Sequence, residues 1–413
     1  MRVLLCQIKF MFIRLSKMSL CFLLIVSAAC TESFDISEEI TEDLLVVNST
    51  LTNKIEKQQI ILSRTIGLNE IDPVFESEAK VFVRENNLKD LNFNEVSEGV
   101  YVSEEEFGIS ADSEYQLFIS TSEGMEYKSN IVTTPPIAAI DKVEAKKIIN
   151  ENGEVGVGIF VSTSDSGSQA EYYRFSFEET YRINAPLWKA VDVVANVSSS
   201  NVIFNTVERP ASKQTCYKTL NSQSINIVST LGLNENKIED LKVNFISSDD
   251  IRMLDRYTIL VKQYVQTQES YAFYKTLENF SNSEDIFTQV QPGFIRGNIV
   301  SITNPNEKVL GFFDVSTISE ARIFFNREDF LEDGLPQYIY NCKEFIPQRQ
   351  ILETTEEFRS RVAIIINSND FRILSIGNLP IYEGDPSIVL VPRECGDCSK
   401  LGNEEAPDFW IDE

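Results

Sequence analysis

The chain has 413 residues, of which 43% are hydrophobic, so it is long enough and apolar enough to form packed cores in two or three domains. Its 63 acidic and 37 basic residues give a formal charge of −26, which argues against a nucleic-acid binder, because such proteins carry a basic surface. It contains no histidine, which excludes Ser-His-Asp triads, Cys-His dyads and zinc or haem held by histidine.

The first 29 residues have the pattern of a secretory signal. Four basic residues and no acidic one accompany a short apolar run at 19–29, which is below the roughly 20 apolar residues of a membrane span. Cys30 follows the small residues Val-Ser-Ala-Ala directly, as in a lipoprotein signal. We therefore expect cleavage before Cys30 and lipidation of its thiol, which would anchor the protein to a membrane. The alternatives are a cleaved signal without lipid and an uncleaved anchor.

Residues 30–43 are predicted to form an acidic, solvated tether, because six of them carry carboxylates. Removal of residues 1–29 takes away four cations and changes the formal charge from −26 to −30. An anionic membrane surface repels a chain of this charge, so we expect the folded part to be attached through its lipid rather than to lie flat on the membrane. Thr31 stands where some lipoproteins carry an Asp that retains them in the inner membrane. This favours the outer membrane and leaves open whether the protein lies on its periplasmic or cell-surface face.

Residues 44–136 are predicted to form a β-sandwich of immunoglobulin-like size. Four β-rich runs of strand length are separated by turn signals, and they lie at 44–51, 58–65, 79–84 and 115–120. The tandem prolines Pro135 and Pro136 cannot donate hydrogen bonds to a sheet, so we expect a domain boundary there.

Residues 137–413 are predicted to form a larger β-rich α+β domain that ends in a cysteine-rich tail. Asn152-Gly153 is a strong hairpin signal, and in the run at 171–181 the aromatic residues Tyr173, Phe175 and Phe177 alternate with polar ones, as in a half-buried strand. Further strands are expected at 139–148, 154–162, 256–265, 297–303 and 308–317.

One helix is predicted, at 268–281. Thr267 can cap its N-terminus, and Glu269 lies in the first turn, where the helix dipole favours a negative charge. An aromatic and aliphatic stripe at helical spacing is interpreted as core rather than as a ligand platform, and it comprises Tyr271, Tyr274, Leu277 and Phe280.

Seven cysteines are present, and Cys6 and Cys21 lie within the signal. With Cys30 lipidated, the remaining four are Cys216, Cys342, Cys395 and Cys398. In an oxidising compartment an even number predicts disulfides, for which three pairings exist. The alternatives are a Cys₄ zinc site, which normally shows two close pairs rather than one, and a redox pair at 395–398, which normally lies between a strand and a helix. We predict structural disulfides and no metal.

Catalytic residues and cofactors are not expected. The neighbouring carboxylates Glu178-Glu179 and Asp249-Asp250 could serve glycoside hydrolysis, but such neighbours arise by chance among 63 acidic residues. Trp188 and Trp410 could stack on sugar rings but are interpreted as packing anchors.

The tail Cys395-Gly-Asp-Cys398 with Pro407-Asp-Phe409-Trp410, together with segments 172–180, 256–263 and 291–298, resembles a family of Bacteroidetes lipoproteins described as domain of unknown function 4249. Members tend to be encoded beside TonB-dependent receptors, so the resemblance implies an envelope lipoprotein that assists such a β-barrel. It implies no catalytic residues. The leading hypothesis is therefore a non-enzymatic accessory lipoprotein whose ligand is unknown. The alternatives are a carboxylate-based glycan hydrolase and a structural or adhesive surface module.

Overall fold

The computed structural model describes residues 43–66, 72–165, 167, 169–198, 201–281, 295–331, 338, 340–376 and 388–412. The predicted signal, Cys30 and the predicted tether up to residue 42 lie outside the described residues. Among the helices of the described part of the chain, none has the length and apolar character that a membrane crossing requires.

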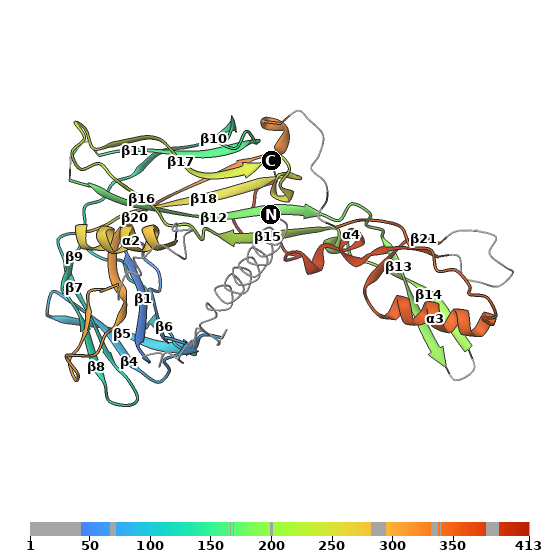
Figure 1. The fold of residues 1–413 in the computed structure, drawn as a ribbon, viewed down its shortest axis with the longest axis horizontal. Helices are drawn as coiled ribbons and strands as arrows, with labels where there is room; N and C mark the ends of the chain where they lie inside the picture. Colours follow the sequence, from blue (N-terminus) through green and yellow to red (C-terminus); the bar gives the residue numbers. More distant parts are fainter. Residues whose placement is uncertain are drawn as a thin grey trace, which may run out of the picture. The chain divides into compact units, whose positions relative to one another are not determined.

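The chain is mainly β, as the sequence predicts (Figure 1). The strands in the first third are β1 (Leu45–Thr52), β2 (Gln59–Arg64), β3 (Val74–Phe75), β4 (Lys80–Glu85), β5 (Lys89–Ser97), β6 (Val100–Ser103), β7 (Glu114–Ser120), β8 (Glu126–Ser129) and β9 (Val132–Thr133). Those that follow are β10 (Ile140–Ile149), β11 (Val155–Ser164), β12 (Tyr172–Asn184), β13 (Val191–Ser198), β14 (Asn201–Glu208), β15 (Thr215–Asn221), β16 (Asn226–Ser229), β17 (Lys237–Ser247), β18 (Tyr257–Val265), β19 (Ile299–Ser301), β20 (Leu310–Phe325), β21 (Phe371–Ile376) and β22 (Ile388–Pro392). The α-helices of the described residues are α2 (Gln268–Ser281), α3 (Thr355–Asn367) and α4 (Arg393–Gly396).

The N-terminal strands form a first core that also takes in residues from much later in the chain. β1 pairs in parallel with the first half of β20, from Val46 opposite Leu310 to Thr52 opposite Ser316, and β19 pairs with β8. Phe313 and Val315 of β20 are buried in the same apolar cluster as the residues of β1, β2, β4 and β7. The body predicted for residues 44–136 is therefore completed by strands that the prediction assigned to residues 137–413.

The second core lies between two packed sheets. β20 continues beyond its pairing with β1 and pairs antiparallel with β18, which pairs with β12. The sheet of β10, β11 and β17 contributes its own buried residues to the same cluster, as in a sandwich. Tyr173, Phe175 and Phe177 are all buried, which confirms the alternation predicted from the sequence. The Asn152-Gly153 hairpin joins β10 to β11, with Gly153 at a φ of +81° that glycine accepts readily.

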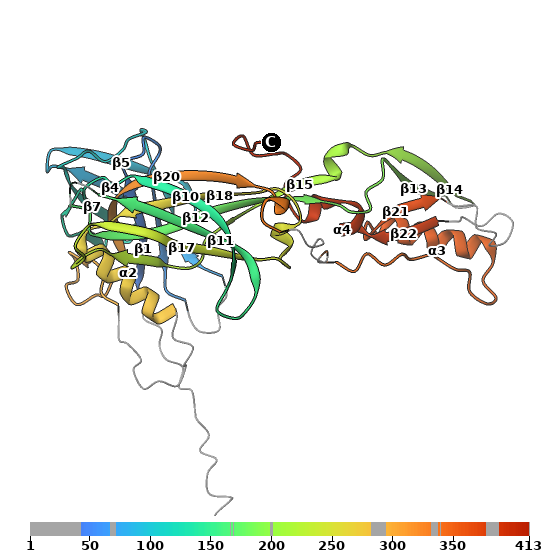
Figure 2. The same ribbon diagram turned by 90° about the horizontal axis from the view of Figure 1, so that it is seen from above.

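A third apolar cluster is formed by α3 with the hairpin of β13 and β14 and the pair of β21 and β22 (Figure 2). Phe358 and Val362 of α3 are buried there beside Val193, Ile373 and Leu390. This helix is not among those predicted from the sequence, because charged residues occupy its first turns. Its start was nevertheless encoded in a capping box, in which Thr354 and Glu357 exchange hydrogen bonds.

The predicted helix at 268–281 is confirmed as α2, and the Thr267 hydroxyl accepts a hydrogen bond from the Ser270 N–H at 3.2 Å. Phe273 is the most buried apolar residue of α2, with 9% exposed, and the predicted stripe residues Tyr271, Tyr274, Leu277 and Phe280 are only half-buried. Helix α2 contacts β12, β16 and β20, and of the stripe residues only Phe280 lines the cavity beside the helix.

Candidate functional site

The α2 helix is held in place by a buried polar network at its N-terminal end. Asp314 of β20 is fully buried and accepts hydrogen bonds from the hydroxyls of Ser270 at 2.7 Å and Ser316 at 3.0 Å. The Arg174 guanidinium of β12 lies 3.5 Å from the same carboxylate. It also stacks 4.1 Å from the ring centre of Tyr264 and 4.6 Å from that of Tyr274 on α2, which favours the cation. Three elements therefore meet at one buried carboxylate.

The segment 295–298 lies opposite α2 and is fixed by glycines and by an asparagine. A Cβ on Gly297 would lie 1.8 Å from the Gly311 carbonyl oxygen, so only glycine permits this approach of the two chains. The Asn298 side chain donates to the Phe313 carbonyl at 2.8 Å and accepts from the Phe313 N–H at 2.9 Å. These contacts hold Gly297 and Asn298, which follow Arg296 in the chain, against β20.

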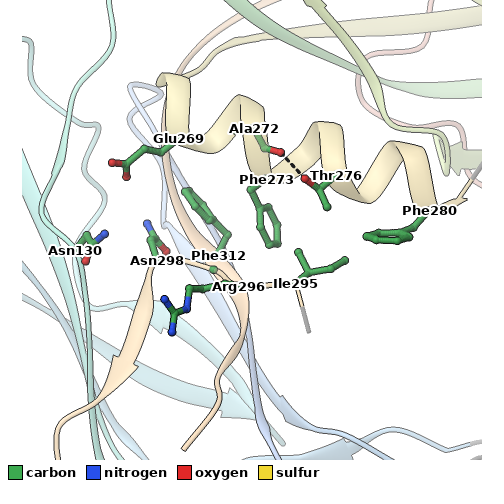
Figure 3. A pocket seen from close by; sticks show the side chains of 11 residues that line it. Asn130, Glu269, Ala272, Phe273, Thr276, Phe280, Ile295, Arg296, Asn298 and Phe312 are labelled. Atoms are coloured by element: carbon green, nitrogen blue, oxygen red, sulfur yellow. Dashed lines mark hydrogen bonds between the residues drawn. The ribbon is translucent and has the colours of Figure 1, made fainter. Parts of the chain in front are cut away.

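A cavity of about 480 Å³ lies between α2 and this segment, and we name it the α2 pocket. Its lining residues are Asn130, Glu269, Ala272, Phe273, Thr276, Phe280, Ile295, Arg296, Gly297, Asn298 and Phe312. Phe273 and Phe312 stack with ring centres 4.9 Å apart. Figure 3 shows Phe273, Ile295 and Phe280 toward one end of the pocket and Glu269, Asn130, Asn298 and Arg296 toward the other. The pocket is therefore amphipathic.

The polar end of the α2 pocket carries one carboxylate and one guanidinium. Glu269 and Arg296 are both exposed, and neither side chain has a hydrogen bond or ion pair with another residue of the described chain. The side-chain amide of Asn130 is likewise without a partner among those residues. Opposite charges and an amide are thus available to a bound molecule beside an apolar wall, which is the usual composition of a ligand site.

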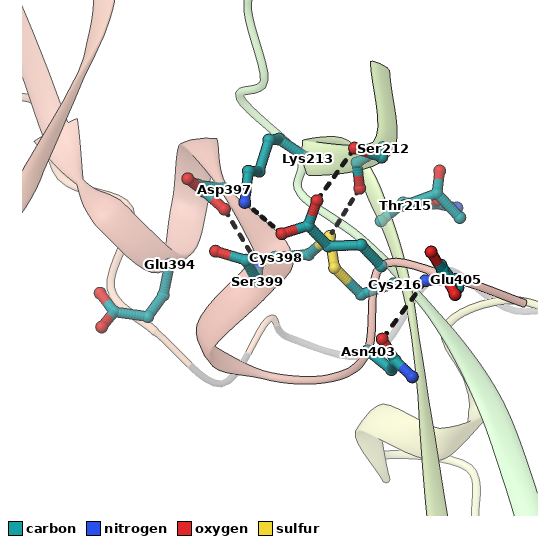
Figure 4. The surroundings of a disulfide bond; sticks show 12 residues. Ser212, Lys213, Thr215, Cys216, Glu394, Asp397, Cys398, Ser399, Asn403 and Glu405 are labelled. Carbon is teal, nitrogen blue, oxygen red and sulfur yellow. Dashed lines mark hydrogen bonds and ion pairs between the residues drawn. A yellow bond between two sulfur atoms is a disulfide. The ribbon is translucent and has the colours of Figure 1, made fainter. Parts of the chain in front are cut away.

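The four predicted cysteines form two disulfides, Cys216–Cys398 and Cys342–Cys395. Their Cα atoms are 5.7 Å and 5.6 Å apart, within the normal range for such bonds. Of the three pairings that the sequence allowed, this is one of the two that separate Cys395 from Cys398. The structure therefore does not use these cysteines as a redox pair or as zinc ligands. Figure 4 shows Cys216–Cys398 joining the tail to β15.

The Gly-Asp between the two tail cysteines also has a structural role. A Cβ on Gly396 would lie 2.8 Å from the Cβ of Arg372, so a larger residue would collide with β21. The buried Asp397 carboxylate lies 3.0 Å from Arg372, 3.2 Å from Arg209 and 3.8 Å from Arg393. Burial alone would raise the pKa of Asp397, but hydrogen bonds from Ser399 and the charge of Arg372 hold that pKa below its usual value.

The carboxylates considered for hydrolysis pair with arginines, except for Asp249, which is exposed. Glu178 pairs with Arg322 at 3.0 Å, whereas Glu179 is buried on the opposite face of β12 and pairs with Arg252 at 2.7 Å. Asp250 reaches the same Arg252 at 2.7 Å. Burial opposes ionisation of Asp250, yet the hydrogen bonds from Arg252 keep its pKa lowered. A general acid for glycoside hydrolysis needs a raised pKa, so this cluster is better suited to holding strands together.

Both tryptophans contact other apolar side chains, which confirms their interpretation as packing anchors. Trp188 packs against the second core. The Trp410 ring lies 4.9 Å from that of Tyr217 and 6.2 Å from that of Phe324, centre to centre.

The α2 pocket is not predicted from the sequence, because its lining residues are far apart in the chain. Arg296 and Asn298 belong to segment 291–298, which the family resemblance had singled out without a role. The helix dipole alone accounts for a negative charge at Glu269, and Phe312 lies within the predicted strand at 308–317 with nothing to mark it as a pocket residue. The available signal was Gly297 in the predicted strand at 297–303, since a glycine in a strand often marks a site where another backbone approaches closely.

Comparison with protein families gives one match. The model described as Domain of unknown function (DUF4249) matches residues 31–322, which is more than half of the chain. The chain therefore belongs to this family. The matched range includes the α2 pocket and ends before the cysteine-rich tail. A search of curated proteins finds no match.

Proposed function

We propose that this chain is a lipid-anchored protein of the bacterial outer membrane that binds a ligand without chemical conversion and assists a TonB-dependent β-barrel receptor. The observation that carries the binding role is the α2 pocket. Its volume of about 480 Å³ and its apolar wall with a few polar groups at one end are typical of ligand sites. Its walls are held by the Asp314 network and by the Gly297 contact, so little ordering is required on binding.

The two disulfides support a location outside the cytoplasm. Cys216–Cys398 closes a sequence separation of 182 residues and Cys342–Cys395 one of 53. Such bonds persist in oxidising compartments such as the periplasm and the cell surface. They agree with the export signal and with Cys30 as the lipid attachment site.

The lining of the α2 pocket favours binding over hydrolysis. Glycoside hydrolysis uses two carboxyl groups that flank the scissile bond, whereas the described residues that line the pocket include one carboxylate, Glu269, and one guanidinium, Arg296. Opposite charges of this kind orient a bound molecule and select its charge pattern.

The receptor role is tested by isolating the native lipoprotein from its own cells in mild detergent and identifying its partners by mass spectrometry. We expect a TonB-dependent β-barrel in stoichiometric amount. Isolation without any such barrel would refute the accessory role and would favour a glycan-directed or adhesive function.

The anchor is tested by fractionating cells that express Cys30→Ala. We expect this variant to appear in the soluble periplasmic fraction, because the thiol that carries the lipid is lost. Cys21→Ala, which changes a cysteine within the signal, is the matched control and should remain with the membrane. If Cys30→Ala also remains with the membrane, the lipid anchor is wrong.

A further inference from the structure

We infer that the α2 pocket binds a short apolar peptide with free termini, whose ammonium group pairs with Glu269 and whose carboxylate pairs with Arg296. The inference rests on the proposed function only in taking this pocket as the binding site. It starts from two opposite charges without partners in the described chain, located at the polar end of an apolar cavity.

The pair of charges points to a zwitterion. A ligand with a single charge would pair with one of the two rim groups and leave the other to solvent, so it would form one charge-assisted contact where a ligand with both charges forms two. A simple anion would in addition be repelled by a chain with a formal charge of −26. A molecule that carries both charges and no net charge pairs with both rim groups and is not repelled. Peptides and amino acids with free termini are the common biological molecules of this kind.

The position of Glu269 sets the direction of the ligand. Glu269 lies in the first turn of α2, where the helix end carries a partial positive charge that would otherwise attract the ligand's carboxylate. The Glu269 carboxylate offsets that charge and favours the ammonium there. The peptide carboxylate is left to Arg296, whose planar guanidinium matches a carboxylate with two parallel hydrogen bonds.

The remaining lining suits apolar side chains on a peptide backbone. The stacked rings of Phe273 and Phe312, with Ile295, form a wall for aliphatic or aromatic side chains. The Asn130 amide can donate to and accept from a peptide group. Since an extended peptide advances about 3.3–3.6 Å per residue, a cavity of about 480 Å³ accommodates a few residues rather than a protein segment.

The test is calorimetric titration of the full mature lipoprotein in detergent with trileucine, N-acetylated trileucine and trileucine amide. With the wild type we expect each cap to weaken binding about tenfold, because each removes one charged hydrogen-bonding partner. N-acetylation should have no effect on Glu269→Gln, and amidation should have no effect on Arg296→Gln. The matched controls Glu123→Gln and Lys89→Gln remove exposed charges elsewhere and should behave as the wild type.

Three results would overturn the inference: no binding of trileucine to the wild type, equal binding of free and capped peptides, or cap effects that persist unchanged in the two pocket variants. Circular dichroism and thermal unfolding of Glu269→Gln and Arg296→Gln verify that they fold, which is expected for exposed residues. Co-isolation of the β-barrel is scored separately. If the β-barrel is co-isolated but trileucine does not bind, only the peptide inference is refuted. If trileucine binds selectively but no β-barrel is co-isolated, only the receptor role is refuted.

Discussion

Replacing Asp314 by Ala should strongly destabilise the protein and loosen the α2 pocket. Asp314 is fully buried and accepts hydrogen bonds from Ser270 of α2 and from Ser316, and it lies 3.5 Å from Arg174. Its loss leaves the Arg174 guanidinium in a mostly buried site without its anion and leaves the Ser270 hydroxyl without its acceptor.

The expected cost is about 3–5 kcal/mol in the free energy of unfolding, the range found when one partner of a buried ion pair is removed. Replacing both charges, as Arg174→Leu with Asp314→Leu, should recover a large part of this loss, because apolar pairs often substitute for buried ion pairs without penalty. The stacking of Arg174 on Tyr264 and Tyr274 limits the recovery, since the double variant loses that contact too.

The assay is urea unfolding followed by circular dichroism with the disulfides intact, together with trileucine titration. Asp90→Ala is the matched control, because Asp90 forms a two-bond pair with Arg84 at 2.7 Å and 3.0 Å in an exposed place. Solvent screens such pairs, so the control should change stability little. The reasoning is refuted if Asp314→Ala loses no more stability than Asp90→Ala, or if its affinity for trileucine equals that of the wild type.

Three further predictions concern the disulfide, acid stability and a glycine contact. Cys216→Ser with Cys398→Ser should lower the free energy of unfolding by about 3–5 kcal/mol in urea, because the bond closes a very long loop; an unchanged midpoint would contradict this. The pKa of Asp397 is lowered in the folded state, so its ionised carboxylate stabilises the fold above the usual carboxyl pKa, and this stabilisation is lost as the pH falls through the folded-state pKa. Between pH 6 and 2 the wild type should therefore lose more stability than Asp397→Asn. Parallel curves of stability against pH would contradict this prediction. Gly297→Ala should lower the free energy of unfolding more than Gly153→Ala and should abolish trileucine binding. Gly153 has open space around it, so its replacement loses only about 1–2 kcal/mol, the cost of a positive φ for alanine. Equal thermal midpoints of the two variants would argue against the close contact at Gly297.

Much of the secondary structure was predictable because its causes are local. The alternation of Tyr173, Phe175 and Phe177 with polar residues reports which face of β12 is buried. The Thr267 cap and the hairpin at Gly153 depend on hydrogen bonds and backbone angles within a few residues. The absence of histidine and the acidic balance are properties of composition alone, and they limited the possible chemistry before any fold was known.

Long-range pairing was decided by the tertiary structure. The sequence allowed three pairings of four cysteines, and only the approach of β15 to the tail selected Cys216–Cys398. In the same way, β1 pairs with a strand more than 250 residues later, because Phe313 and Val315 complete an apolar core that the N-terminal strands cannot close alone. No local sequence pattern indicates such a partner strand, since the pairing depends on which apolar surface the N-terminal strands leave uncovered.

The α2 pocket shows most clearly which features depend on local sequence and which depend on the tertiary structure. The sequence by itself predicted that 268–281 is a capped helix, and it predicted a strand at 297–303, of which the structure keeps β19 at Ile299–Ser301. Only the packing of α2 on β20 placed Glu269 and Arg296 at the same end of one cavity. The physical reason is that a helix cap and a strand pattern are read from neighbours in the chain, whereas a binding site is defined by side chains whose distance in space is independent of their distance in sequence.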